Sequence, residues 1–198
     1  MKRLIALFCF ICTYTMSAQD IALNADDTST YLERHPIYDY TGEIEAIDTI
    51  PGFATKPNKL KVTGTVFLSD GSTPAKDVIL YIEQADEYGN FDLKKHNDKR
   101  CVENRGWIKT DANGNYTFYT YVPGGDRRYR MLQQLFIAVK APNKAEKNME
   151  SFLFDDDPLL TKQCRKKIHK KGDPSRILKP KKEGDLLVAQ KDIVLAED

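Results

Sequence analysis

The sequence predicts an all-β fold, an antiparallel sandwich or barrel, from three observations. Several short segments alternate polar and apolar residues and are rich in β-branched or aromatic side chains, as half-buried strands are. Turn-forming pairs such as Asp70-Gly71 separate these segments. No stretch has the apolar spacing of a long amphipathic helix. Short strands joined by turns are typical of sandwiches and barrels.

The predicted strands follow one another from residue 60 to the end of the chain. The first alternates over residues 60–67, and the second, residues 78–82, is apolar enough to be more fully buried. Aromatic residues recur at every second or third position of residues 115–121, which indicates a strand with one buried face. The remaining β-rich runs are residues 106–110, 135–140, 151–154 and 186–195.

Length and composition fit one globular domain. The chain has 198 residues, of which 41% are hydrophobic, and 30 basic residues against 29 acidic ones give a net charge of +1. A near-neutral total excludes a wholly basic nucleic-acid binder. Ten Tyr, nine Phe and one Trp supply the large apolar side chains that a packed core needs.

The N-terminus has the pattern of a secretory signal peptide. Lys2 and Arg3 precede the apolar residues 4–12, and the small residues Ser17 and Ala18 follow. This apolar run is far shorter than the roughly 20 residues of a membrane-spanning helix, and no other segment approaches that length. The sequence therefore predicts cleavage after residue 18, export to the periplasm or the outside, and no membrane span.

Two cysteines remain after such a cleavage, Cys101 and Cys164. An oxidising compartment permits them to form a disulfide, but spacing alone does not decide between a pair and two free thiols. Neither has a second Cys or a His at the spacing of a zinc site.

Charge is unevenly distributed along the chain. Residues 19–50 contain eight acids and one base, so residues 19–59 are expected to form an acidic, irregular leader that packs on the body, residues 60–198. Residues 161–182 contain ten Lys or Arg and one acid, Asp173. This basic segment is expected to be a solvated loop before the last strand, and a polyanion contact is its functional alternative. It has no aromatic residues to stack on bases, which argues against nucleic acid.

Three segments resemble the intradiol ring-cleavage dioxygenases, the catechol and protocatechuate type, in its short exported branch. They are Thr63-Gly64-Thr65-Val66 through Asp70-Gly71 to Val78, then Arg105-Gly106-Trp107 with Thr110-Asp111 and Gly114-Asn115-Tyr116, then Phe152-Leu153-Phe154-Asp155-Asp156-Asp157-Pro158 followed by Lys191-Asp192-Ile193-Val194-Leu195. The resemblance covers residues 60–195 and implies a β-sandwich of the intradiol dioxygenase core type. It also implies Fe(III), bound by two Tyr phenolates and two His, because hard anionic oxygen donors stabilise ferric iron.

The positions that match those iron ligands carry other residues here. Counting from the neighbouring turns and from Val139-Lys140-Ala141-Pro142 gives Phe91, Asp126, Gln134 and Phe136. Phenylalanine has no lone pair to offer a metal, Asp126 could bind one, and Gln134 could do so weakly. A substitute set from Asp126, Tyr129, His96 and Tyr88 is the alternative. No competent metal site and no cofactor are expected, unless the family activity and its Fe(III) survive.

The resemblance and its departures together predict a catalytically degenerate protein that acts as a binding module. Its partner would be a small aromatic compound, a glycan or a protein, and no catalytic residue is assigned. One alternative is an active non-haem iron dioxygenase that cleaves a catechol-like ring with O2. A second alternative is a transthyretin-like or carboxypeptidase-regulatory-like sandwich, because a shared fold does not determine function.

Overall fold

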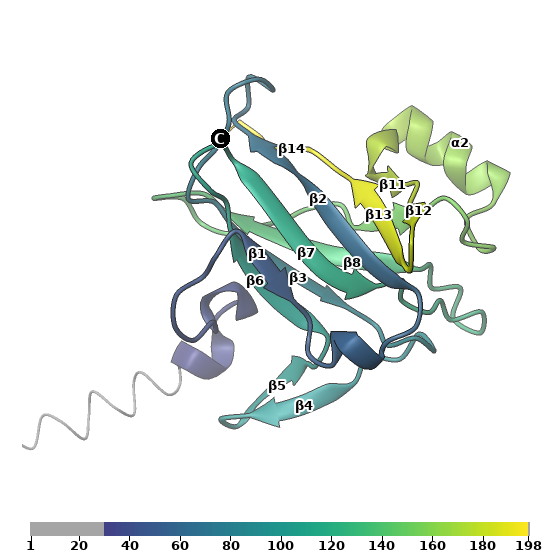
Figure 1. The fold of residues 1–198 in the computed structure, drawn as a ribbon, viewed down its shortest axis with the longest axis horizontal. Coiled ribbons are helices and arrows are strands. Elements are labelled where there is room, and N and C mark those ends of the chain that lie inside the picture. Colours follow the sequence, from purple (N-terminus) through teal and green to yellow (C-terminus); the bar gives the residue numbers. More distant parts are fainter. Residues whose placement is uncertain (1–29, 198) are drawn as a thin grey trace, which may run out of the picture. The chain divides into compact units, whose positions relative to one another are not determined.

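The computed structural model describes residues 30–197, and Figure 1 shows the course of the chain. The predicted signal peptide, residues 1–18, and residues 19–29 of the acidic leader lie outside the described part. The described residues belong to two units, residues 30–34 in the first and residues 35–197 in the second. Residues 30–33 of the first unit are helical. The second unit contains two six-stranded β-sheets and a two-stranded hairpin.

The first sheet is centred on strands β2 and β7, which pair antiparallel from Lys59 opposite Tyr121 to Thr65 opposite Asn115. The short strand β1 runs parallel to β7, and β13 and β14 run parallel to β2. In spatial order the sheet contains β1 (Ile47–Thr49), β7 (Asn115–Tyr121), β2 (Lys59–Phe67), β13 (Leu186–Gln190) and β12 (Lys181–Glu183), with β14 (Ile193–Val194) on the end of β2.

The second sheet is centred on strand β3, which pairs antiparallel with β6 on one side and β8 on the other. In spatial order it contains β11 (Ile177–Leu178), β10 (Phe152–Phe154), β8 (Gln134–Lys140), β3 (Ile79–Gln84) and β6 (Arg105–Lys109), with β9 (Lys147–Asn148) on β8. A separate hairpin is formed by β4 (Leu93–His96) and β5 (Lys99–Val102).

The core lies between the two sheets, which stack as two layers (Figure 1). Burial alternates along β2, so that Leu60, Val62, Gly64 and Val66 are buried and the residues that alternate with them are only partly buried. Phe118 of β7 and Leu80 of β3 are fully buried in the same cluster. Each such side chain stabilises the fold by about 1.5–3 kcal/mol relative to an exposed one.

The predicted β-sandwich is thus confirmed, including strands close to each predicted run. Sequence patterning missed helix α2 (Lys162–Lys171), the hairpin β4–β5, and the short strands β1, β9, β11 and β12. The expectation of a basic loop is wrong for residues 162–171, because Thr161 accepts a hydrogen bond from the Cys164 amide and caps a helix there. A 3-10 helix, η3 (Pro174–Arg176), follows it.

Residues 35–58 run over the body as a leader with little regular structure. Its 3-10 helices are η1 (Pro36–Tyr38) and η2 (Phe53–Thr55). Ile37 is fully buried against Tyr81 and Ala138, on the face of the second sheet that points away from the main core. Strand β1 extends the first sheet beside β7. The leader therefore covers one outer face and adds one edge strand.

Candidate functional site

Three of the four positions that match the family's iron ligands converge at one end of the sandwich. Phe91, Gln134 and Phe136 line one enclosed space together with Ala85, Gly89, Gly124, Met131 and Leu132. The ring centroids of Phe91 and Phe136 lie 5.7 Å apart with an interplanar angle of 56°. The space that remains has no room for a water molecule, about 0 Å³. Packed aromatic side chains fill the position.

The backbone around this space is held by two glycines. A Cβ at Gly124 would lie 2.3 Å from the Gly89 nitrogen, and Gly89 itself has φ +90°, which only glycine adopts without strain. These loops therefore approach one another more closely than residues with side chains could, and they bring Phe91 against strand β8.

Asp126, the residue at the fourth position, does not line this enclosed space. Its backbone bridges to Met131, with N–H···O distances of 2.9 Å and 2.8 Å. Its Oδ1 accepts hydrogen bonds from the amides of Arg128 at 2.8 Å and Tyr129 at 3.2 Å. The carboxylate thus stabilises its own turn.

The donors at these positions do not fit ferric iron. The Gln134 amide oxygen is already an acceptor for the Ser151 hydroxyl at 2.8 Å, and the two phenylalanines supply no donor atoms. Within residues 30–197, no three His, Cys, Asp or Glu side chains gather where they could hold a metal ion. The side chains of this site therefore offer a ferric ion no coordination set.

The substitute set is not assembled either. Tyr88 and Tyr129 are 77% and 68% exposed. His96 lies on the exposed strand β4 and lines a different cleft. Asp126 and Tyr129 contact one another through the turn just described.

The possible disulfide is not formed. Cys101 is buried on β5, and Cys164 lies in the first turn of α2, where its sulfur is 3.2 Å from the Thr161 hydroxyl; both are free thiols. Figure 1 shows β5 and α2 well apart, so no local rearrangement would join them.

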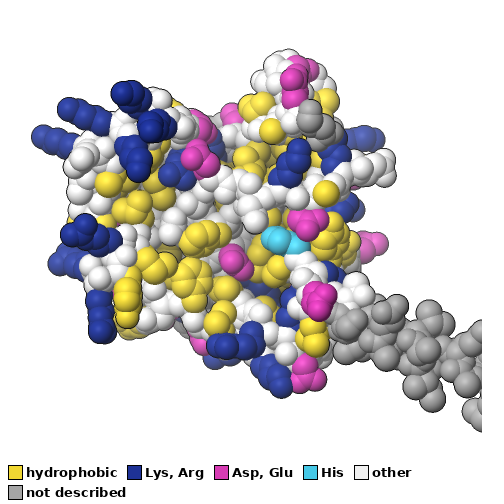
Figure 2. All heavy atoms as spheres, turned by 180° about the vertical axis from the view of Figure 1, so that it is seen from behind, with side chains coloured by type: hydrophobic (Ala, Val, Ile, Leu, Met, Phe, Trp, Pro, Cys, Tyr) yellow, Lys and Arg dark blue, Asp and Glu magenta, His cyan; other side chains and the backbone are white. Residues whose placement is uncertain are grey.

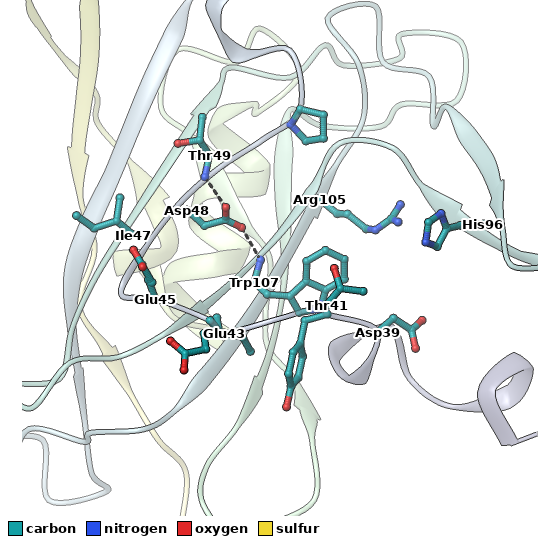
Figure 3. Close-up of a pocket in the computed structure, with 13 residues that line it drawn as sticks. Asp39, Thr41, Glu43, Glu45, Ile47, Asp48, Thr49, His96, Arg105 and Trp107 are labelled. Atoms are coloured by element: carbon teal, nitrogen blue, oxygen red, sulfur yellow. Dashed lines mark hydrogen bonds between the residues drawn. The ribbon is translucent and has the colours of Figure 1, made fainter. Parts of the chain in front are cut away.

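A polar cleft of about 530 Å³ opens between the leader and strand β6 (Figure 3). Its acids are Asp39, Glu43, Glu45 and Asp48. Asp39 forms an ion pair with Lys99 at 2.6 Å, in which both side chains are about nine-tenths buried. Asp48 accepts hydrogen bonds from its neighbour Thr49 and from Trp107. Asp39 and Asp48 therefore hold the leader against β5 and β6.

Trp107, the only tryptophan, forms the back of this cleft. Its amide donates to Asp48 Oδ2 at 2.8 Å and its indole N–H to the Pro36 carbonyl at 3.0 Å. The Arg105 guanidinium lies 5.4 Å from its ring centroid and Tyr81 packs against it at 5.4 Å. Because these neighbours already contact the ring, the cleft offers little bare aromatic surface for a ligand.

A second groove, here called the C-terminal groove, lies between β10, η3 and the last strand. It encloses about 570 Å³, within the range of small-molecule sites. Its apolar wall consists of Val139, Met149, Phe152, Ile193, Val194, Leu195 and Ala196. Its polar side includes Glu150, Asp173, Ser175, Arg176 and Lys191. This combination of an apolar wall and fixed cations is unlike the polar leader cleft.

The cations of the C-terminal groove are held by their neighbours. Lys191, 8% exposed, donates to the Ser175 hydroxyl and to Asp173 Oδ2 at 3.2 Å. Burial raises the pKa of Asp173, but hydrogen bonds from Ser175 and the Lys191 ammonium outweigh it and hold that pKa below its usual value. The ion pair requires the ammonium form of Lys191, so its nitrogen has no lone pair with which to activate Ser175 as a nucleophile.

Arg176 also lines this groove, and its guanidinium donors are only partly used. One of its terminal nitrogens donates to the Ser151 carbonyl at 3.0 Å. Its Nε is buried, has no hydrogen-bond partner within residues 30–197, and lies 3.8 Å from Glu150 Oε2. Sequence reasoning missed the groove because its walls come from segments 139–152 and 173–196, which carry no common motif.

Comparison with solved structures finds this fold in intradiol dioxygenases. The dioxygenase domain of a dioxygenase carbohydrate-binding protein fusion from Streptomyces sp. SirexAA-E gives a TM-score of 0.61 at 22% identity, over 80% of this chain and 93% of that one. Catechol 1,2-dioxygenase from Acinetobacter sp. ADP1 gives 0.54 at 16% identity, over 90% and 68%. An intradiol ring-cleavage dioxygenase from Tetranychus urticae gives 0.54 at 16% identity, over 78% and 89%.

No protein-family model matches the sequence, and no curated protein matches it significantly. Likeness at these identities shows the fold, so the predicted resemblance to intradiol dioxygenases is confirmed at that level. Within residues 30–197, no helix is long and apolar enough to cross a membrane.

Proposed function

We propose that this chain is a catalytically degenerate protein of the intradiol dioxygenase fold that acts as a binding module. The observation that carries the proposal is the packing of Phe91 against Phe136, at 5.7 Å between ring centroids, where the family resemblance implies a tyrosine and a histidine. A catechol ring and a ferric ion need open space and four donor atoms. The space here admits no water molecule, and its two phenylalanines donate nothing.

The proposed ligand is a small aromatic compound with an acidic group, bound in the C-terminal groove. The apolar wall would cover the ring, and the positive charge of Arg176, which lines the groove, would attract the carboxylate. A groove of about 570 Å³ is large enough for one or two fused rings. A glycan or a protein partner remains the alternative occupant. The N-terminal pattern further leads us to propose an exported protein.

The test of lost catalysis is metal content and colour. Protein purified from iron-rich medium is expected to be colourless, to contain far less than one iron per chain by elemental analysis, and to consume no O2 with catechol or hydroxyquinol. Visible absorption with one iron per chain and ring cleavage would establish the active-dioxygenase alternative and refute the proposal.

The test of the groove is binding of benzoate and 2-naphthoate by calorimetry or ligand-observed NMR. Naphthoate is expected to bind more tightly, because it covers more of the apolar wall. Arg176→Gln should weaken binding at least fivefold, whereas Lys179→Gln, an exposed residue outside the groove, should not change it. If the wild-type protein binds neither compound, the proposed aromatic ligand is refuted, whereas the proposal of lost catalysis is unaffected.

A further inference from the structure

Helix α2 presents five exposed lysines and no acid. Here called the basic face, these are Lys162, Lys166, Lys167, Lys170 and Lys171. The chain then adds the exposed Lys179, Lys181 and Lys182. Figure 2, which views the molecule from behind, shows Lys and Arg side chains projecting from the corner that α2 occupies in Figure 1. Although the net charge of the chain is near zero, the exposed side of α2 is positively charged.

The inner side of α2 anchors the helix and leaves the basic face outward. Arg165 donates to the carboxylate and the carbonyl of Asp155, and to the Leu160 carbonyl at 3.2 Å. Cys164 and Ile168 are half-buried beside it. Residues one turn apart lie about 6 Å from each other along a helix, so Lys162, Lys166 and Lys170 form one row of ammonium groups.

These lysines have no ion pair with an acid within residues 30–197, where Arg165 is the residue of α2 that forms one. Like charges one turn apart oppose helix formation, and cations in the first turn oppose the helix dipole. The helix thus carries a repulsion that a bound polyanion would relieve.

We infer that the basic face of α2 binds an acidic polysaccharide. Charge complementarity specifies a polymer with regularly spaced carboxylate or sulfate groups. Residues 161–182 contain no Phe, Tyr or Trp to stack on bases, and the single arginine of the helix is turned inward to Asp155. The apolar residues Ile168, Ile177 and Leu178 are half-buried or buried, so nothing on this face would insert into a bilayer. This surface does not depend on whether the fold has lost catalysis.

The test measures binding of the full chain to polygalacturonate and heparin, with a 20-base-pair DNA duplex and phosphatidylglycerol vesicles as competing classes. We expect tightest binding to the polysaccharides, with the logarithm of the affinity falling linearly with the logarithm of salt concentration. Lys166→Glu/Lys170→Glu should weaken binding at least tenfold. The matched pair Lys76→Glu/Lys109→Glu changes two exposed lysines elsewhere and should weaken it less than threefold.

Far-UV circular dichroism distinguishes lost charge from a lost helix, and Lys166→Gln/Lys170→Gln provides the milder change. This neutral pair should weaken binding about threefold or more while the helix is retained. Binding to no polysaccharide at low salt would overturn the inference, as would equal losses in both charge-reversal pairs. Tighter binding to the duplex would identify nucleic acid as the ligand of the basic face, and tighter binding to the vesicles would identify an anionic membrane. Either result would overturn the inference of a polysaccharide.

Discussion

The Tyr116 hydroxyl donates a hydrogen bond of 2.7 Å to the Lys191 carbonyl, across the inside of the first sheet. Tyr116 is 1% exposed, and burial, followed by the charge of Asp192, raises the pKa of its phenol. Gly64 lies against the same carbonyl, because a Cβ there would be 2.0 Å from the Lys191 oxygen. Asp192 Oδ1 in turn accepts from the Thr65 amide at 2.9 Å.

These contacts join three of the sequence segments that carry the family resemblance. Thr63-Gly64-Thr65-Val66, Gly114-Asn115-Tyr116 and Lys191-Asp192-Ile193 meet at one crossing, where the last segment passes over β2. The motifs therefore position a strand crossing, and the oxygen atoms of Tyr116 and Asp192 form hydrogen bonds within it. Their role at this crossing is structural, and it does not depend on a bound metal.

Tyr116→Phe is expected to destabilise the fold by about 1–3 kcal/mol, because it leaves the buried Lys191 carbonyl without its donor. Urea unfolding measures the loss. Tyr119→Phe is the control on the same strand, since its hydroxyl forms no hydrogen bond within residues 30–197 and it lies half-exposed. Equal stability of the two variants would mean that the crossing is held by packing alone.

Gly64→Ala should cost about 3 kcal/mol or more, because the added methyl meets backbone that cannot rotate away. Gly42→Ala, with φ +80° and open space around it, should cost only about 1 kcal/mol of backbone strain. Thermal unfolding of the two variants checks the order. A smaller loss at Gly64 would show that the last segment can shift outward.

Strand patterning predicted the body of the fold because each long strand has one buried face. Along β2 the inward positions are Leu60, Val62 and Val66, a period of two that is visible in the sequence. The hairpin strand β4 has no such face, because all four of its residues are exposed. Helix α2 turns only Cys164, Arg165 and Ile168 toward the body, which is too little apolar surface to produce a helical period.

In the candidate site, too, the sequence predicted some features, whereas others depend on contacts between distant segments. Gapless counting from neighbouring turns selected Phe91, Gln134 and Phe136, which the structure brings together. Counting also selected Asp126, but the turn from Asp126 to Met131 directs its carboxylate to local amides. The C-terminal groove was not predictable, because the long-range packing of Phe152, Arg176 and Ile193 creates it.

The packed pair Phe91 and Phe136 predicts energetic coupling between two distant positions in the sequence. Each substitution by alanine should destabilise the fold by about 1–3 kcal/mol, since both side chains are half-buried. A double-mutant cycle should give a coupling of about 0.5–1.5 kcal/mol, the value of an aromatic pair beyond its burial. Coupling near zero would mean that the rings are not in contact in solution and that the space is open.

Asp48→Ala should loosen the leader and change the environment of Trp107. Loss of the 2.8 Å bond to the Trp107 amide removes a charged acceptor, which is worth about 1.5–3 kcal/mol. Because Trp107 is the only tryptophan, a red shift of its emission reports the change directly. Asp48→Asn keeps an acceptor oxygen and should restore much of the wild-type spectrum. An unchanged spectrum in Asp48→Ala would show that the indole bond to Pro36 holds the ring alone.

The hydrogen bonds to the Asp70 carboxylate are expected to stabilise the fold near neutral pH, and this stabilisation is expected to be lost in acid. The Thr73 hydroxyl at 2.5 Å, then the amides of Thr73 and Ser72, lower the pKa of Asp70 to about 2. A lowered folded-state pKa stabilises above the unfolded value of about 3.9, and this stabilisation is lost as pH falls from there through about 2. Carboxyl NMR titration should find the low pKa, and Thr73→Val should raise it by removing the hydroxyl donor. The similar turn at Asp111, whose pKa is lowered mainly by the Asn115 amide, should be unaffected. If Asp70 titrates near 3.9 in the wild-type protein, the turn is open in solution and the contribution is absent.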